Sequence, residues 1–384
     1  MIVYPVKHSP LLRQPEHFIA RDELKTLIKK VTHNLVNIHD ETGEFLLRLD
    51  DGRVIDTKGW AGWEWTHGVG LYGMYQYYLQ TGDETIRDII DSWFADRFAE
   101  GATTKNVNTM APFLTLAYRY EETRNPAYLP WLDSWAEWAM HEMPRTEFGG
   151  MQHITLAEEN HQQMWDDTLM MTVLPLAKIG KLLNRPDYIE EATYQFLLHV
   201  QNLMDKDTGL WFHGWSYEGN HNFANARWAR GNSWLTIVIP DFLELLDLPE
   251  NNAVHRYLVQ VLNAQIAALA KCQDESGLWH TLLLQYLQQL PQSYLEASAT
   301  AGFAYGILKA VRKRYVGQEY TLVAEKAIRG IVQHISPEGE LLHTSFGTGM
   351  GHNLDFYRNI PRTSMPYGQA MAMLCLTEYL RKYF

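Results

Sequence analysis

Cysteine is scarce in this chain: Cys272 and Cys375 are the only two among 384 residues. Two thiols are too few for a disulfide framework or a thiolate metal site. No apolar run approaches the length of a membrane span. The first residues, MIVYPVKHSPLLRQPEHF, contain no continuous apolar stretch of the kind that marks a secretory signal. These absences predict a soluble, cytoplasmic protein with no membrane partner.

Basic clusters are missing as well. The net charge is −12, and no group of Lys or Arg residues interrupts the acidic background. Nucleic acids and anionic membranes are therefore poor candidates for partners, and an anionic ligand would need a local Arg or Lys to hold it. No Pro-, Gly- or Ser-rich linker separates two cores. Residues 1–384 are therefore expected to form one large domain, although length alone would suggest two or three.

Motifs for nucleotide, zinc-protease and serine-hydrolase chemistry are also absent. The sequence has no Walker loop, no H-E-x-x-H and no G-x-S-x-G. The glycine-rich stretch GTGMGH at 347–352 does not lie between a β-strand and a helix, as a dinucleotide site requires. The sixteen histidines include no i,i+4 pair with a third ligand. We therefore expect neither a metal nor a cofactor.

What the sequence does have is helical periodicity. Apolar residues recur at three- and four-residue spacing in about twelve segments, such as NSWLTIVIPDFLELL and ATAGFAYGILKAVRKRY. Strand-like alternation is confined to short pieces, EFLLRLDDGRVID and GLWFHGWSY. Short turns with Gly, Pro or Asn alternate with longer loops. This pattern predicts an all-α fold of six helical hairpins closed into an (α/α)6 barrel. An open helical solenoid, built from the same hairpins, is the alternative.

The longer loops are rich in Trp, His and Gly, and we expect them to gather on one rim, where a site would lie. Any one of these aromatic residues could simply pack in the core. Three such loops on one rim favour a sugar site, because rings stack on sugar C–H groups while polar groups bind the hydroxyls. Arg230, within RWARGNSW, could hold an anion through its planar fork or form a surface ion pair. The other candidates from these loops are Trp65, His67, His153, His213 and Trp228.

Two adjacent aspartates, Asp166 and Asp167, stand between Trp165 and an apolar helical pattern in HQQMWDDTLMM. Such a pair at a helix start ordinarily provides an N-cap and a first-turn acid. A catalytic acid needs a raised pKa, which apolar neighbours such as Trp165 and Met170 could provide. One aspartate can cap while the other faces a pocket, so both roles stay open at this point.

The motifs GGMQH, QQMWDDTLMM, WFHGW, RWARGNSWLT, SYLEASATAGFAYGILKA and YGQAMAMLCLTEYL together resemble those of glycoside hydrolase family 105. These unsaturated rhamnogalacturonyl hydrolases are similar to the unsaturated glucuronyl hydrolases of family 88. The resemblance runs from about Trp60 to the C-terminus and implies an (α/α)6 barrel. It also implies a small oligosaccharide substrate, left by pectin or rhamnogalacturonan lyases, with a 4,5-unsaturated uronic acid at its non-reducing end.

The implied reaction is hydration of the C4=C5 bond by one aspartic acid, first as acid and then as base, followed by release of the next sugar. Ordinary glycosidases instead need two carboxylates. Motif matching gives the proton-donor role to Asp167 and a structural role to Asp166. The family's second acid falls near NVNTMAPF, where this chain has Asn108, so the positioning of water is open. The resemblance implies that substrate is bound by His153, His213, Trp228 and Arg230.

Two other functions stay open. A sugar epimerase or isomerase on the same barrel would use a pair of histidines, and His67, His153, His213 and His352 are available for that. A non-catalytic carbohydrate-binding protein would be compatible with Asn108 in place of an acid. The sequence does not predict the oligomeric state.

Overall fold

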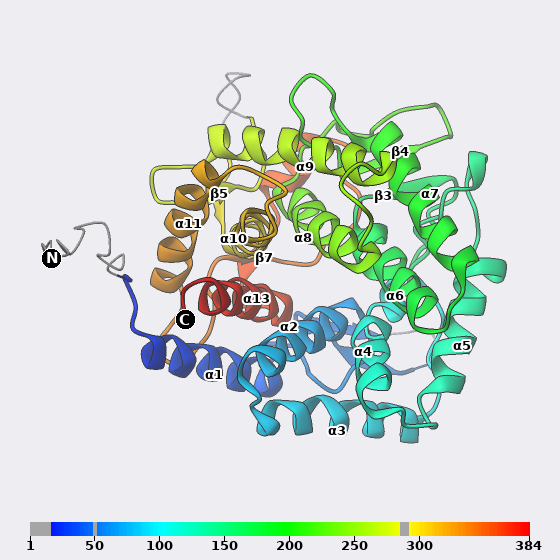
Figure 1. Ribbon diagram of the computed structural model, residues 1–384, viewed down its shortest axis with the longest axis horizontal. Helices are drawn as coiled ribbons and strands as arrows, with labels where there is room; N and C mark the ends of the chain where they lie inside the picture. The colour runs from blue at the N-terminus through cyan, green and yellow to red at the C-terminus, as the bar shows by residue number, and fades with distance from the viewer. Residues whose placement is uncertain (1–16, 49–51, 285–291) are drawn as a thin grey trace, which may run out of the picture.

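The computed structural model describes residues 17–48, 52–284 and 292–384, which are mostly helical (Figure 1). The predicted helical class is therefore confirmed. The α-helices are α1 (Arg21–Asn37), α2 (Trp65–Thr81), α3 (Glu84–Glu100), α4 (Phe113–Thr123), α5 (Leu129–Glu137), α6 (Leu174–Leu182), α7 (Pro186–Leu203), α8 (Ala229–Leu246), α9 (Ala253–Cys272), α10 (Ala297–Arg312), α11 (Thr321–Gln333), α12 (Leu354–Arg358) and α13 (Pro366–Tyr383).

The strands are short and pair two by two. They are β1 (Leu46–Arg48) with β2 (Val54–Asp56), β3 (Gln163–Trp165) with β4 (Gly214–Ser216), β5 (Trp279–His280) with β6 (Leu295–Glu296), and β7 (Thr344–Ser345) with β8 (Arg362–Thr363). All four pairs are antiparallel. β1, β2 and β4 fall within the two stretches in which the sequence shows strand-like alternation.

The helices form an inner and an outer ring (Figure 1). The inner helices α2, α4, α6, α8, α10 and α13 contact one another in that order, and α13 closes the ring against α2. Each outer helix packs on the inner helix that neighbours it along the chain, such as α3 on α2 and α11 on α10, while α1 packs on α13. The helical pairs predicted from the turns are therefore present.

Hydrophobic patterning explains which helices lie inside. Every residue of α10 from Ala297 to Val311 is buried, its few polar side chains included, so this mostly apolar helix is covered on all sides. The outer helix α11 instead buries one face, at Ala324, Ala327, Ile328 and Ile331, with the three- and four-residue spacing of an amphipathic helix. The core therefore lies between the rings and along the inner helices.

Small residues allow the inner helices to approach one another closely. A Cβ atom at Gly306 of α10 would lie 2.0 Å from the backbone oxygen of Thr236 in α8. A Cβ atom at Gly231, in the first turn of α8, would lie 2.2 Å from a carboxyl oxygen of Asp166. Glycine at these positions therefore sets the distance between α8 and its neighbours, including the aspartate pair.

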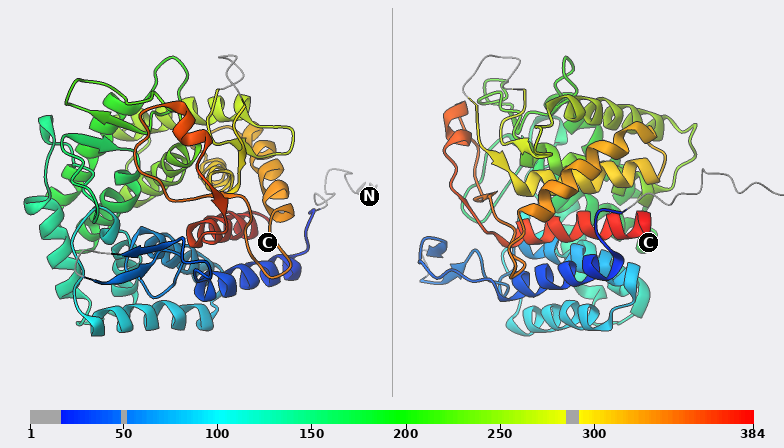
Figure 2. Two further views of the ribbon diagram at one scale, coloured as in Figure 1. Left: turned by 180° about the vertical axis from the view of Figure 1, so that it is seen from behind. Right: turned by 90° about the vertical axis from the view of Figure 1, so that its left-hand side faces the viewer.

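The two ends of the molecule differ. Short turns join inner to outer helices at one end, and Gly82 ends α2 in the left-handed conformation, with φ 68°. At the other end, the longer loops and the strand pairs gather (Figure 2, right). This is the loop-rich rim predicted for a site. No helix among the described residues is long and apolar enough to cross a membrane.

Candidate active site

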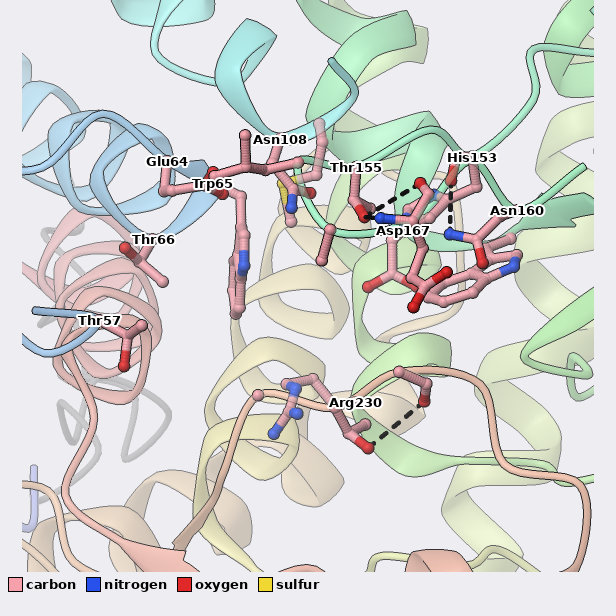
Figure 3. Close-up of a pocket in the computed structure, with 18 of the residues that line it drawn as sticks. Thr57, Glu64, Trp65, Thr66, Asn108, His153, Thr155, Asn160, Asp167 and Arg230 are labelled. Carbon is pink, nitrogen blue, oxygen red and sulfur yellow. Dashed lines mark hydrogen bonds between the residues drawn. The ribbon is translucent and has the colours of Figure 1, made fainter. Parts of the chain in front are cut away.

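A cavity of about 320 Å³ opens among the long loops (Figure 3). This volume is at the lower end of the roughly 300–1,000 Å³ of small-molecule sites. Its walls come from β2, the start of α2, residues 153–160, the end of β3, the start of α8 and residues 347–349. The candidate residues that line it are Trp65, His67, Asn108, His153, Asp167, Trp228 and Arg230.

The pairing of β3 with β4 delivers the two aspartates to the cavity. The backbone N–H of Asp166, just after β3, donates to the carbonyl of His213, just before β4, at 3.0 Å. The chain then enters a π turn at Leu169–Val173 before α6. Asp166 is completely buried against the start of α8, whereas Asp167 lines the cavity. Of the pair, Asp167 is therefore the one that a substrate can reach.

Burial and mutual charge separate the pKa values of the two carboxyl groups. Neither carboxyl oxygen of Asp166 has a hydrogen-bond partner of normal geometry. Burial, followed by the charge of Asp167, raises the pKa of Asp166 well above its usual value. Burial alone would also raise the pKa of Asp167, but the hydrogen-bonding and charge interactions with His213 hold it below its ordinary value. At neutral pH, the pair therefore carries a proton on Asp166 and a negative charge on Asp167.

His213 lies behind Asp167 and is not one of the residues that line the cavity. Its Nε2 is 3.4 Å from Oδ2 of Asp167, and its Nδ1 is 2.8 Å from the hydroxyl of Tyr357. The ring packs against Trp165 and Trp228, with centroid distances of 5.2 and 4.5 Å. His213 therefore contacts Asp167 from behind the cavity wall, and its predicted contact with the substrate stays a prediction.

His153 does line the cavity. Its ring stacks on Trp165 at 4.1 Å between centroids, and its Nδ1 is 2.8 Å from the hydroxyl of Thr168. Burial lowers the pKa of His153 to about 4. At neutral pH the imidazole is therefore uncharged, which suits hydrogen bonding to a sugar hydroxyl better than holding an anion.

Arg230, in the first turn of α8, supplies a buried positive charge. It is only 1% exposed and lines the cavity. Its guanidinium donates hydrogen bonds to the carbonyls of Ser345 at 2.8 Å and Phe346 at 2.9 Å, and it lies 4.5 Å from the centre of the Trp228 ring. These oxygens are uncharged, and among the described residues no carboxylate lies within ion-pair distance of the guanidinium. A carboxylate ligand would therefore complete its charge balance.

The start of α2 forms the wall that carries Trp65 and His67. Trp65 packs on Tyr367 with 4.6 Å between ring centroids. Both ring nitrogens of His67 contact backbone groups: the N–H of Glu64 donates to Nδ1 at 3.0 Å, and Nε2 is 2.8 Å from the carbonyl of Gly59. Because backbone groups contact both ring nitrogens, His67 shapes the wall of the cavity in this arrangement, and its predicted part in substrate binding stays a prediction.

Two residues at the site were not identified from the sequence. Tyr357, in the short helix α12, holds His213 from a segment 144 residues away, and no local pattern signals that contact. Glu64 lines the cavity directly before Trp65. In the sequence it reads as an ordinary cap of α2, although an acid within an aromatic loop was a usable signal.

The aspartate pair also belongs to a group of side chains with the chemistry of metal ligands. Among the described residues, one ligand atom from each of Asp166, Asp167 and His213 lies within 4.8 Å of the others. Two carboxylates and an imidazole form a donor set that zinc and other divalent ions accept. However, the proton on Asp166 would have to leave before the group could bind a metal. The absence of a metal therefore stays a prediction.

Comparison with known proteins identifies the family of this chain. A sequence profile for Glycosyl Hydrolase Family 88 matches residues 37–383. The unsaturated rhamnogalacturonyl hydrolase YesR of Bacillus subtilis (strain 168) is 30% identical over 322 residues, covering 83% of this chain and 90% of YesR. A crystal structure of a possible GH105 member from Salmonella enterica serovar Paratyphi A is 90% identical, with a TM-score of 0.96 over all of both chains. Another, from Klebsiella pneumoniae, is 84% identical, with a TM-score of 0.95 over all of both chains. This chain is therefore a glycoside hydrolase that belongs to family 105, a relative of family 88.

Proposed function

We propose that this enzyme acts on oligosaccharides that carry a 4,5-unsaturated uronic acid at the non-reducing end, such as an unsaturated galacturonyl-rhamnose from pectin. The observation that carries the proposal is the pairing of one reachable aspartate, Asp167, with a buried guanidinium, Arg230, in a cavity walled by indole rings. The name of the YesR relative gives the same class of activity. Figure 3 shows Asp167 and Arg230 on different sides of this cavity.

We also propose that the closed ring of helices is an (α/α)6 barrel and that residues 1–384 form one catalytic domain. The cyclic contacts of the six inner helices support the closed barrel over an open solenoid, because a solenoid leaves its first and last helices apart. In this arrangement the loop-rich end presents the cavity, and the short turns form the opposite rim.

Substrate orientation follows from the two charged groups. The uronate carboxylate binds Arg230, the sugar ring lies against Trp65 and Trp228, and C4 then faces Asp167. His153 and Asn108 are left to bind hydroxyl groups. Arg230 is better suited than a lysine would be, because its fork engages both oxygens of a carboxylate.

The proton that the reaction needs comes from the aspartate pair, Asp166 and Asp167. Asp166 holds the proton in the free enzyme, and the uronate anion makes the negative charge of Asp167 less favourable, which raises the pKa of Asp167 and favours a proton shared between the two carboxyl groups. Asp167 then protonates C4, and water adds to C5 as Asp167 takes up its proton. The product is a hemiketal, which opens and releases the next sugar. One proton is borrowed and returned, so no second carboxylate at the anomeric carbon is required.

The two alternative functions fit the site less well. A proton-shuttling pair of histidines would need free ring nitrogens, and His67 has none. The low pKa of His153, about 4, also makes it a poor base near neutral pH. A purely sugar-binding protein would not need a buried pair of aspartates with opposed pKa shifts.

The test is the ultraviolet absorbance of the conjugated C4=C5 bond during incubation with lyase products. Loss of absorbance is expected with pectin-derived disaccharides, and none with the Asp167→Asn variant, which should still bind. A chelator should leave the rate unchanged, because no step uses a metal. If lyase products from neither pectin nor glycosaminoglycans lose absorbance, the proposed function is wrong.

A further inference from the structure

Glu64 occupies a position that the proposed reaction does not explain. It is the residue before α2, and it lines both the substrate cavity and a second, small cavity of about 80 Å³. Two polar residues, Asn106 and Thr109, also line the small cavity. Glu64 is therefore a carboxyl group placed between the substrate and a polar recess. A simple helix cap does not require such a position.

The contacts of Glu64 leave its carboxyl group without a cation. Its neighbours are the side chain of Asn108, the backbone N–H of Trp65 and, in a capping box, the backbone N–H of His67. None of the described residues forms an ion pair with it. Figure 3 places Glu64 and Asn108 together on one side of the cavity. Asn108 stands where the family resemblance predicts an acid, so the acid on this wall comes from a different segment of the chain.

The charges in the cavity determine which protonation state of Glu64 favours substrate binding. The free site already holds a negative charge at Asp167 and a positive charge at Arg230, and the uronate brings a further negative charge. An ionised Glu64 would add a further buried negative charge beside the uronate. Burial raises the pKa of Glu64 to about 7, so near neutral pH it is readily protonated. The charged and titratable groups on the surrounding elements are Arg53, Asp56, His67, His153, Glu158, Asp167 and Arg230.

We propose that Glu64 is a substrate-binding residue that works in its neutral form, in which it donates a hydrogen bond to a hydroxyl of the uronic acid ring while Asn108 holds its other oxygen. This inference rests on the proposed function. A neutral carboxyl group can donate, whereas a carboxylate can only accept and would repel the anionic sugar. Loss of the proton therefore weakens substrate binding without touching the aspartate pair.

The experiment measures KM for an unsaturated galacturonyl-rhamnose from pH 6 to pH 8 in the wild type and in Glu64→Gln. If only neutral Glu64 binds substrate, a pKa of about 7 predicts that the wild-type KM rises about tenfold over this range. The glutamine amide keeps the donor and cannot ionise, so the KM of the variant should stay within about twofold. Equal pH dependence of KM in the two proteins would overturn the inference.

A matched control separates substrate binding from helix capping. Asp83 also precedes a helix, accepting a hydrogen bond from the N–H of Thr85 at 3.1 Å, but it does not line the cavity. Asp83→Asn should therefore keep the wild-type dependence of KM on pH. If it loses that dependence as Glu64→Gln does, the effect comes from capping and the inference fails.

A second measurement keeps the test independent of the variant's folding and of turnover. Calorimetric titration of the wild type with galacturonate at pH 7.5, in buffers of different ionisation enthalpy, should show proton uptake on binding. Absence of uptake would refute the role of Glu64. The two proposals fail differently: without turnover of unsaturated substrate by the wild type the proposed function falls, whereas turnover without proton uptake removes only the role of Glu64.

Discussion

Replacing Arg230 with methionine removes the positive charge of the cavity while keeping a long, apolar side chain. The guanidinium is buried, and its hydrogen bonds to the carbonyls of Ser345 and Phe346 leave its charge unbalanced. Truncating one partner of a buried, hydrogen-bonded charge pair costs about 2–5 kcal/mol. We therefore expect kcat/KM for an unsaturated uronide to fall by about 30- to 5,000-fold. The fall in kcat/KM should be smaller for Arg230→Lys, because lysine keeps the positive charge but cannot bind both oxygens of a carboxylate as the planar guanidinium does.

The assay compares the unsaturated uronide with its uncharged uronamide. The wild type should prefer the carboxylate strongly, and Arg230→Met should prefer it little or not at all. Arg227→Met is the matched control, since Arg227 pairs with Asp205 and does not line the cavity; its kcat/KM should change less than about twofold. An undiminished preference of Arg230→Met for the carboxylate would show that the anion is held elsewhere.

Three further predictions concern stability. Because burial and charge raise the pKa of Asp166, the wild type loses stability as pH rises from the ordinary carboxyl range to the raised pKa. The melting temperature of Asp166→Asn should therefore be higher than that of the wild type at pH 8, and the difference should shrink toward pH 4. Gly306→Ala should lower the free energy of unfolding by about 1–3 kcal/mol in a denaturant titration, since its Cβ would meet the backbone oxygen of Thr236. A Cβ at Gly349 would have no atom within 4 Å, so Gly349→Ala should leave the free energy of unfolding unchanged in the same titration. Lys309→Met should cost about 3–5 kcal/mol, because it leaves a buried aspartate of α8 unpaired; an unchanged midpoint would contradict this.

Several features of this protein could be read from its sequence. Three- and four-residue periodicity identified the helices, including α10. The Gly-containing turn after α2 predicted a helix end, and Gly82 indeed adopts the left-handed conformation there. These features are local, because hydrogen bonds within about four residues and the pattern of apolar side chains determine them.

The assignments within the site depended on contacts between distant segments. The family resemblance assigned the proton to Asp167 and a structural role to Asp166, but local sequence patterns could not show that Asp166 is buried against α8 while Asp167 reaches the cavity. Nor could they show that His213 contacts Asp167 from behind, or that backbone groups occupy both ring nitrogens of His67.

Glu64 is the clearest case of a residue whose place in the site depends on tertiary structure. From the sequence alone it is a residue before a helix, and only the packing of separate loops makes it part of the cavity wall beside Asn108. Residue type determines what a side chain can donate, accept or titrate. Burial and neighbouring charge determine its protonation state, and these arise only when segments far apart in the chain come together.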